Sequence, residues 1–364
     1  RACSLLPALT GNFAKPGAGL LYLNGGGQKG VDGNYLAAPH LSTSPETLSQ
    51  MDMAAYLESA ENARAFLCWN INPVASSPEQ ARLMQALKRD DLFTVVLDIF
   101  ATDTTDFADY VLPAAAFLEF NDLVSGYFNM SFSAQAKVAE PMGVALPNQE
   151  IFRRLASAMG FGEPELQESD EDIIAHVVKD VGIEGGFEAL KANGTMFPNP
   201  EPQLQFAGLK FPTASGKIEI ACAAAEADGH PRLPQPGSDA RPSDGRLRLI
   251  TPASEWLMND SYANDGKIQK QLGPAIVTIN PAEAEARGLT AGSRVRLSNG
   301  TGSLELEVAL SDMVAPGVAH SVKGRWPRSA GAKRANVNTL NPGVKSDMGE
   351  SSAVHGVEVE ISAV

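Results

Sequence analysis

The run A-F-L-C-W-N-I-N-P at residues 65–73 and the run L-F-T-V-V-L-D-I-F-A-T-D-T at residues 92–104 decide the fold. Each run begins with a short apolar stretch that suits a buried strand and closes with a polar loop. A helix-like segment at 78–90 separates them, and a short strand at 111–113 follows. This order of strand, loop and helix predicts a parallel sheet with right-handed crossovers, part of a doubly wound α/β nucleotide-binding domain.

The second loop holds the best single candidate for a binding residue. Asp98 ends its strand, and in open α/β sheets the carboxyl ends of parallel strands face the ligand crevice. A carboxylate there can accept paired hydrogen bonds from a ribose diol or a guanine edge, although a helix cap or a surface charge explains it equally well. Thr102 and Thr104 add hydroxyl groups within one turn, where threonine also serves as an ordinary local cap.

The first loop carries two amides. Asn70 and Asn72 bracket one residue before Pro73, which stiffens the loop and leaves both amides free to read a base or a phosphate. Turn chemistry alone explains the same residues. A glycine-rich run at 24–27 follows an apolar stretch and is either a plain surface loop or a phosphate contact, since it lacks the G-x-G-x-x-G order.

The last third of the chain has a different character. Several segments there alternate apolar and polar residues, and glycine-rich turns separate them, which predicts a small closed barrel of six strands, double-psi-like in type. A short helix is predicted at 281–287. The predicted strands are 247–251, 275–279, 293–297, 304–310, 318–322 and 357–361.

Between these parts the pattern is helical and irregular. Helices are predicted at 45–60, 151–159 and 170–181, with irregular chain at 120–147 and a strand-like run at 217–221 in a proline- and glycine-rich stretch. We therefore expect three segments: an α/β half-domain at 1–125, a connecting region at 126–245 and the barrel at 246–364.

Composition excludes several classes of function. A chain of 364 residues that is 44% hydrophobic can bury a sizeable core. A net charge of −14 argues against non-specific binding to nucleic acid or to an anionic membrane. No apolar run is long enough to span a bilayer, so we expect no direct membrane insertion. Cys3, Cys68 and Cys222 lie far apart, so this chain alone builds neither a zinc nor an iron–sulfur site.

The motifs resemble those of the molybdopterin oxidoreductases of the dimethyl sulfoxide reductase family, in the same order and over nearly the whole chain. The barrel segment I-N-P-A-E-A-E-A-R-G-L-T-A-G-S-R-V-R-L-S-N-G at 279–300 is similar to the C-terminal cofactor-capping domain of that family, and G-R-W at 324–326 with N-T-L at 338–340 fits its later part. The α/β matches are P-A-L-T-G-N at 7–12, L-x-W-N-x-N-P, L-F-T-V-V-L-D-x-F-x-T-x-T, A-D-Y-V-L-P-A-A and L-E-x-x-D.

The resemblance implies molybdenum or tungsten bound between two pterin guanine dinucleotides, and oxygen-atom transfer, dehydrogenation or a related reaction. It implies that Asp98, Phe100 and Thr102 contact the guanosine of one dinucleotide. The loop at 70–73, with Asn70, Asn72 and Pro73, lines the same nucleotide by the same implication. In the barrel, Ser261 of the loop 256–264 and Asn338 are implied to approach the pterins.

The family's metal ligand and iron–sulfur cysteines precede the region matched here. We therefore interpret this chain as the C-terminal portion of a longer polypeptide. Its expected partners are the N-terminal portion of the same polypeptide, which would hold a [4Fe-4S] cluster, and an iron–sulfur electron-transfer subunit. Two alternatives stay open: a bis-pterin enzyme of non-redox chemistry, such as a hydratase or hydroxyl transferase, and a cofactor-free scaffold in a respiratory complex. The compartment, cytoplasmic or periplasmic, is not readable from these residues.

Overall fold

The structure, a computed structural model, describes residues 2–20, 30–42, 47–127, 129–199, 201, 204–236, 242–243, 245–328, 336–346 and 349–364. The glycine-rich run at 24–27 lies outside these ranges. The chain forms two compact units, each built from two stretches of sequence. Unit 1 consists of Arg1–Pro45 and Pro113–Pro236, and unit 2 of Glu46–Leu112 and Gly237–Val364.

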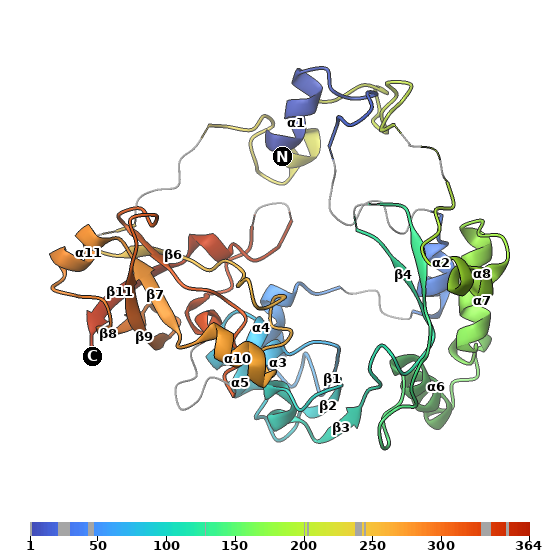
Figure 1. Ribbon diagram of the computed structural model, residues 1–364, viewed down its shortest axis with the longest axis horizontal. Helices are drawn as coiled ribbons and strands as arrows, with labels where there is room; N and C mark the ends of the chain where they lie inside the picture. Colours follow the sequence, from blue (N-terminus) through green and yellow to red (C-terminus); the bar gives the residue numbers. More distant parts are fainter. Residues whose placement is uncertain are drawn as a thin grey trace. The chain divides into compact units, whose positions relative to one another are not determined.

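Unit 2 contains the predicted sheet, with strands in the order β1-β2-β3 (Figure 1). β1 (Ala65–Trp69) pairs in parallel with β2 (Phe93–Asp98), and β3 is Tyr110–Pro113. Trp69 stands opposite Leu97, so the loops that follow β1 and β2 leave from the same edge of the sheet.

Short helices cover this sheet because their apolar residues recur on one face. In α5 (Gln80–Ala86), Leu83 and Ala86 are buried, and Leu87 follows in the next turn. They pack with Ala54 and Leu57 of α3 (Met53–Leu57), which follows the 3-10 turn η2 (Gln50–Asp52). α4 (Pro73–Ser76) begins with a proline, which suits a first helical turn.

The C-terminal part of unit 2 is a closed six-stranded barrel in the order β10-β6-β11-β8-β9-β7. Alternate residues point inward, as in β9, where Leu304, Leu306 and Val308 are buried. β10 pairs in parallel with β6 and β7 with β9, whereas the pairs β10–β7, β11–β6, β11–β8 and β8–β9 are antiparallel. The strands are β6 (Leu247–Ile250), β7 (Ile276–Ile279), β8 (Arg294–Ser298), β9 (Ser303–Leu310), β10 (Val318–His320) and β11 (Glu358–Ala363).

The parallel sheet and the closed barrel confirm the fold class predicted from the sequence. All six barrel strands form close to the predicted ranges. The remaining elements of unit 2 are short: α10 (Gly266–Leu272), α11 (Pro281–Ala286), and the 3-10 turns η3 (Asp103–Phe107), η5 (Val337–Leu340) and η6 (Val354–Gly356).

Unit 1 is mostly helical around a small hairpin. Phe132 on the hairpin packs with Ile174 and Val178 of α7 and with Leu190 of α8. Figure 1 shows these two helices beside the hairpin. The elements are α1 (Ala2–Leu9), α2 (Gly33–Ala37), η1 (Pro39–Leu41), β4 (Asp122–Ser125), β5 (Phe132–Gln135), α6 (Asn148–Met159), η4 (Pro164–Leu166), α7 (Asp170–Asp180), α8 (Gly186–Asn193) and α9 (Ala223–Ala227).

Several local predictions are wrong. The stretch at 120–147, expected to be irregular, holds the hairpin β4–β5, whose four-residue strands are too short for alternation to signal them. The prediction misses α8 and α10. No strand forms at 217–221, where Thr213 and Ser215 donate hydrogen bonds to the carbonyl of Lys217 instead. The helix expected at 45–60 is reduced, within its described part, to η2 and α3.

The compact units also group the chain differently from the three predicted segments. Residues 46–112 join the barrel in unit 2, whereas 113–125 join the connecting region in unit 1. The functional roles assigned to the three segments stay predictions.

Candidate functional site

The loop after β1 is bound tightly to the loop after β2. Asn70 adopts the left-handed conformation, with φ of 56°, and its N–H donates to the carbonyl of Leu97 at 3.2 Å. Asn72 is only 3% exposed. Its amide nitrogen donates to Asp103 at 3.1 Å, and its amide oxygen accepts from the N–H and hydroxyl of Thr104 at 3.2 and 2.8 Å. The expectation of two free amides is therefore wrong for Asn72, whose side chain joins the two loops.

Asp98 lies half-buried at the carboxyl end of β2. Burial raises the pKa of its carboxyl, the N–H groups of Phe100 and Ile99 oppose that rise, and the carboxylate of Asp260 adds to it. The Phe100 N–H donates to the carboxylate at 3.1 Å. No ion pair of Asp98 is present in the described ranges, so its carboxylate can accept hydrogen bonds from a ligand.

Large apolar side chains lie on the same two loops as that carboxylate. Trp69, Ile71, Ile99 and Phe100 are all exposed to solvent. Aromatic faces beside a carboxylate suit a planar heterocycle, because the rings stack on it while the carboxylate accepts from its edge. The arrangement fits a guanine base, which offers adjacent N–H donors.

Thr102 adds a buried hydroxyl group to the same loop. Its side chain is 1% exposed, and its hydroxyl makes no hydrogen bond among the described residues. An unsatisfied buried hydroxyl costs about 1–3 kcal/mol, and a ligand or an ordered water at this point would remove the cost. The Thr104 hydroxyl is occupied, because it donates to Asn72 and accepts from the N–H of Val74.

The barrel presents a strained loop at 256–264. Ser261 is exposed there, between Asn259 and Tyr262, whose φ values of 58° and 71° are unusual for side-chain-bearing residues. The Trp326 indole donates to the carbonyl of Asp260 at 2.8 Å and so helps to fix the loop. Gly324, with φ of 99°, lies so close to the Asn259 carbonyl that a Cβ would collide with it.

Asp260 adds a second carboxylate near Asp98. Burial raises the pKa of Asp260, the carboxylate of Asp103 adds to the rise, and Lys323 opposes it. Burial, and then the nearby charge of Asp98, raises the pKa of the buried Cys68 thiol to about 12. The site is therefore rich in hydrogen-bond acceptors, which favours a ligand that offers donors.

Asn338 lies in η5, where it holds the barrel against the α/β part rather than pointing freely at solvent. Its amide donates to the carbonyl of Ala75 at 2.8 Å, and Asn336 donates to the same oxygen at 2.8 Å. Pro73 is buried at the start of α4, next to this contact.

The structure thus brings all eight predicted site residues into unit 2, on the two strand-end loops, the loop 256–264 and η5. Their roles toward a cofactor stay predictions. Sequence reasoning misses the residues that join these segments, chiefly Asp103, Asp260, Arg328 and Asn336. Their partners lie far away along the chain, so no local pattern signals them.

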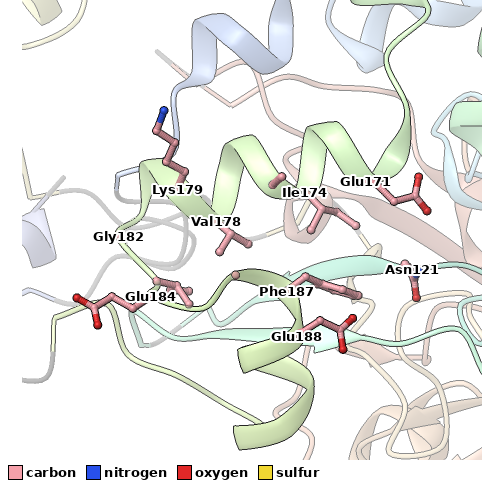
Figure 2. A pocket seen from close by; sticks show the side chains of 12 residues that line it. Asn121, Glu171, Ile174, Val178, Lys179, Gly182, Glu184, Phe187 and Glu188 are labelled. Atoms are coloured by element: carbon pink, nitrogen blue, oxygen red, sulfur yellow. The ribbon is translucent and has the colours of Figure 1, made fainter.

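A cavity of about 640 Å³ lies elsewhere, in unit 1. Figure 2 shows Ile174 and Val178 of α7 facing Phe187, with Glu171 and Glu188 at the edge. None of the eight predicted residues lines it. Among the described residues, no group of three or more His, Cys, Asp or Glu side chains is arranged to hold a metal ion. None of the described helices has both the length and the apolar character needed to cross a membrane.

Two protein families match the chain: Molybdopterin oxidoreductase over residues 1–158, and Molydopterin dinucleotide binding domain over residues 247–358. The chain is 32% identical to the probable oxidoreductase YoaE of Bacillus subtilis, over 100% of the chain and 54% of that protein. It is 26% identical to trimethylamine-N-oxide reductase 1 of Escherichia coli K12, over 98% of the chain and 50% of that protein. The chain therefore spans about half the length of the curated relatives it matches.

Among solved structures, the fold is similar to that of acetylene hydratase from Pelobacter acetylenicus. The TM-score is 0.72 at 19% identity, covering 87% of this chain and 47% of that one. This likeness concerns the fold.

Proposed function

The chain belongs to the molybdopterin oxidoreductase family, and we propose that it binds pterin guanine dinucleotide cofactor within a molybdenum- or tungsten-dependent bis-pterin enzyme. When bound, that cofactor supplies two-electron chemistry, either oxygen-atom transfer or dehydrogenation of a small substrate. In this proposal the remaining length seen in relatives provides the metal ligand and a [4Fe-4S] cluster, and an iron–sulfur subunit exchanges electrons with it.

The observation that carries the proposal is the placement of Asp98. Its half-buried carboxylate has no cationic partner in the described ranges and lies at a strand end, on a loop that also carries the exposed side chains of Ile99 and Phe100. In our assignment it accepts hydrogen bonds from the guanine edge, and the Thr102 hydroxyl contacts the same nucleoside. The barrel loop 256–264, with Ser261, and Asn338 contact the pterins and limit the access of water.

Replacing Asp98 tests the assignment. In the intact, cofactor-matured protein, Asp98→Ala should lower the pterin, guanine nucleotide and metal retained per protein by roughly tenfold, because charge-assisted hydrogen bonds are lost. Turnover per retained cofactor should stay unchanged, since Asp98 holds the cofactor and takes no part in the chemical step. Acid release of GMP and elemental analysis measure retention.

Asp90→Ala is the matched control. Asp90 is exposed and precedes the same strand, at its amino end, so its replacement should leave retention at the wild-type level. Full cofactor occupancy in Asp98→Ala would contradict the guanosine assignment. Absence of pterin and of both metals from matured wild-type protein would refute the proposed function itself.

Two other functions make different predictions. The fold likeness to acetylene hydratase raises a non-redox bis-pterin reaction as the second candidate, for which substrate turnover needs neither electron donor nor acceptor. A cofactor-free scaffold would leave the strand-end loops without a ligand. The retained motif from Asp98 to Thr104 favours the cofactor-binding reading over the scaffold.

A further inference from the structure

We propose that the buried pair Asn72 and Asp103 is a positioning device that sets the geometry of the guanosine site and couples it to the barrel. The inference rests on the proposed function, because the site it positions is the one around Asp98. Neither residue touches the nucleotide in this assignment. Each acts through the backbone of the loops that carry Asp98 and Thr102.

The first step is the bond between the loops. Asn72 and Asp103 are 3% and 4% exposed, and the amide nitrogen of Asn72 donates to Oδ2 of Asp103 at 3.1 Å. The amide oxygen accepts twice from Thr104, which is fully buried. Because each of these groups is buried, a mismatch of donors and acceptors cannot be repaired by solvent.

The second step links the loops to the barrel. The other carboxylate oxygen of Asp103 accepts the backbone N–H of Arg328 at 2.6 Å. The guanidinium of Arg328 donates to the carbonyl of Ala101 at 2.9 Å and pairs with Asp106. The segment 98–103 is therefore held by β2 at one end and by Asn72 and the barrel segment at the other.

The residues assigned to the guanosine lie between these two points of attachment. Asp98, Phe100 and Thr102 all lie on that short segment, so a shift at Asp103 moves the groups assigned to the guanosine. Outer-shell residues that orient metal ligands typically change metal affinity by about 10–100-fold when they are replaced, and we expect an effect at the lower end of that range here. The network also makes the guanosine site depend on docking of the 325–328 segment of the barrel.

The network permits a swap experiment. In Asp103→Asn, two amide nitrogens face each other, or the Arg328 N–H loses its acceptor. In Asn72→Asp, two carboxylates face each other. In the double variant, the carboxylate at position 72 accepts from Thr104 and from the new amide at position 103, whose oxygen accepts from Arg328. Every hydrogen bond is then restored with one direction reversed.

We expect each single variant to retain about tenfold less pterin and guanine nucleotide per folded protein, with faster cofactor release in urea below the unfolding transition. The double variant should return to within about threefold of wild type. The folded fraction is measured by circular dichroism, so retention is compared among folded molecules. Asn62→Asp and Asp90→Asn, which make the same charge changes at exposed positions, serve as controls and should match wild type.

The outcomes separate the two proposals. If Asp98→Ala loses cofactor while both single variants keep it, the positioning role is refuted and the proposed function stands. If Asp98→Ala also keeps it, the guanosine assignment fails and the inference fails with it. Only the absence of pterin and of both metals from matured wild-type protein refutes the proposed function. Loss in the single variants without recovery in the double variant shows that the hydrogen-bond match is not the cause, which also overturns the inference. Should a single variant not fold, Thr104→Val, which removes only one hydroxyl from the network, must still lower retention.

Discussion

Burial raises the pKa of Asp98, and backbone N–H groups oppose only part of the effect. The folded chain therefore holds this proton more tightly than the unfolded chain. The stability associated with the group is fully present below the ordinary pKa of 3.8 and is lost as pH rises through the raised value. A binding carboxylate of this kind destabilises the free protein, and a ligand that donates hydrogen bonds reverses the cost.

Asp98→Asn should therefore stabilise the cofactor-free chain at neutral pH. The gain in free energy of unfolding over wild type should be small below the ordinary pKa and grow as pH rises through the folded value. Urea unfolding at about pH 3 and about pH 7 measures it. The carboxylate of Asp260 also raises the pKa of Asp98. In an Asp260→Asn background, the stability gained by Asp98→Asn at neutral pH should therefore be smaller. A gain that is independent of pH would contradict the assignment.

At the scale of the element, alternation along the barrel strands decides which residues form the core. In β8, Val295 and Leu297 are fully buried, whereas the outward Arg296 forms an ion pair with Glu305 at 3.1 Å. The inward face of β8 therefore supplies its contacts with the core, and the outward face is exposed. Its register with β9, which places Leu297 opposite Leu304, keeps the inward residues in contact.

Leu297→Ala should lower the free energy of unfolding by about 2–5 kcal/mol, because it leaves a cavity among rigid neighbours. The adjacent Arg296→Ala removes only an exposed ion pair and should cost less than about 1 kcal/mol. Chemical denaturation of the two variants tests this. Equal losses would mean that the barrel does not have the inward and outward faces described.

At the scale of the molecule, unit 2 joins an α/β piece and a barrel that are far apart in the chain. Asn336, only 1% exposed, donates to the carbonyls of Ala75 and Arg325 at 2.8 and 2.7 Å. The Thr339 hydroxyl donates to Gln80 at 2.7 Å, and Lys345 pairs with Asp52. These bonds make the sheet and the barrel a single compact body, on which any ligand bound to both depends.

Asn336→Ala should therefore lower the protection of amides in both β2 and the barrel strands. The expected loss is about 1–3 kcal/mol, because the Arg325 carbonyl loses its bond from Asn336 and the Ala75 carbonyl keeps only the one from Asn338. Hydrogen exchange followed by mass spectrometry resolves the two regions. Thr301→Ala offers a comparison, since Thr301 contacts Asn299 through its backbone N–H, which the substitution keeps. Loss of protection confined to residues next to position 336 would show that the two parts unfold independently.

The sequence by itself determined the fold class and where its polar loops begin. Periodicity is a local property, so the apolar runs at 65–69 and 92–97 and the alternating strands of the barrel could be recognised residue by residue. The position of Asp98 at a strand end follows from the same pattern. Periodicity does not predict the hairpin β4–β5 or the helices α8 and α10, because such short elements depend on packing more than on their own pattern.

Only the tertiary structure decided how the candidate site is held together. It showed that the amide of Asn72 is engaged by Asp103 and Thr104, that the Thr102 hydroxyl is buried without a partner among the described residues, and that Arg328 reaches the same loop from the barrel. Asp103 and Arg328 are separated by 225 positions in the chain. Hydrogen bonds over such distances leave no periodic signal, because they are selected by the geometry of the folded chain and not by neighbouring residues.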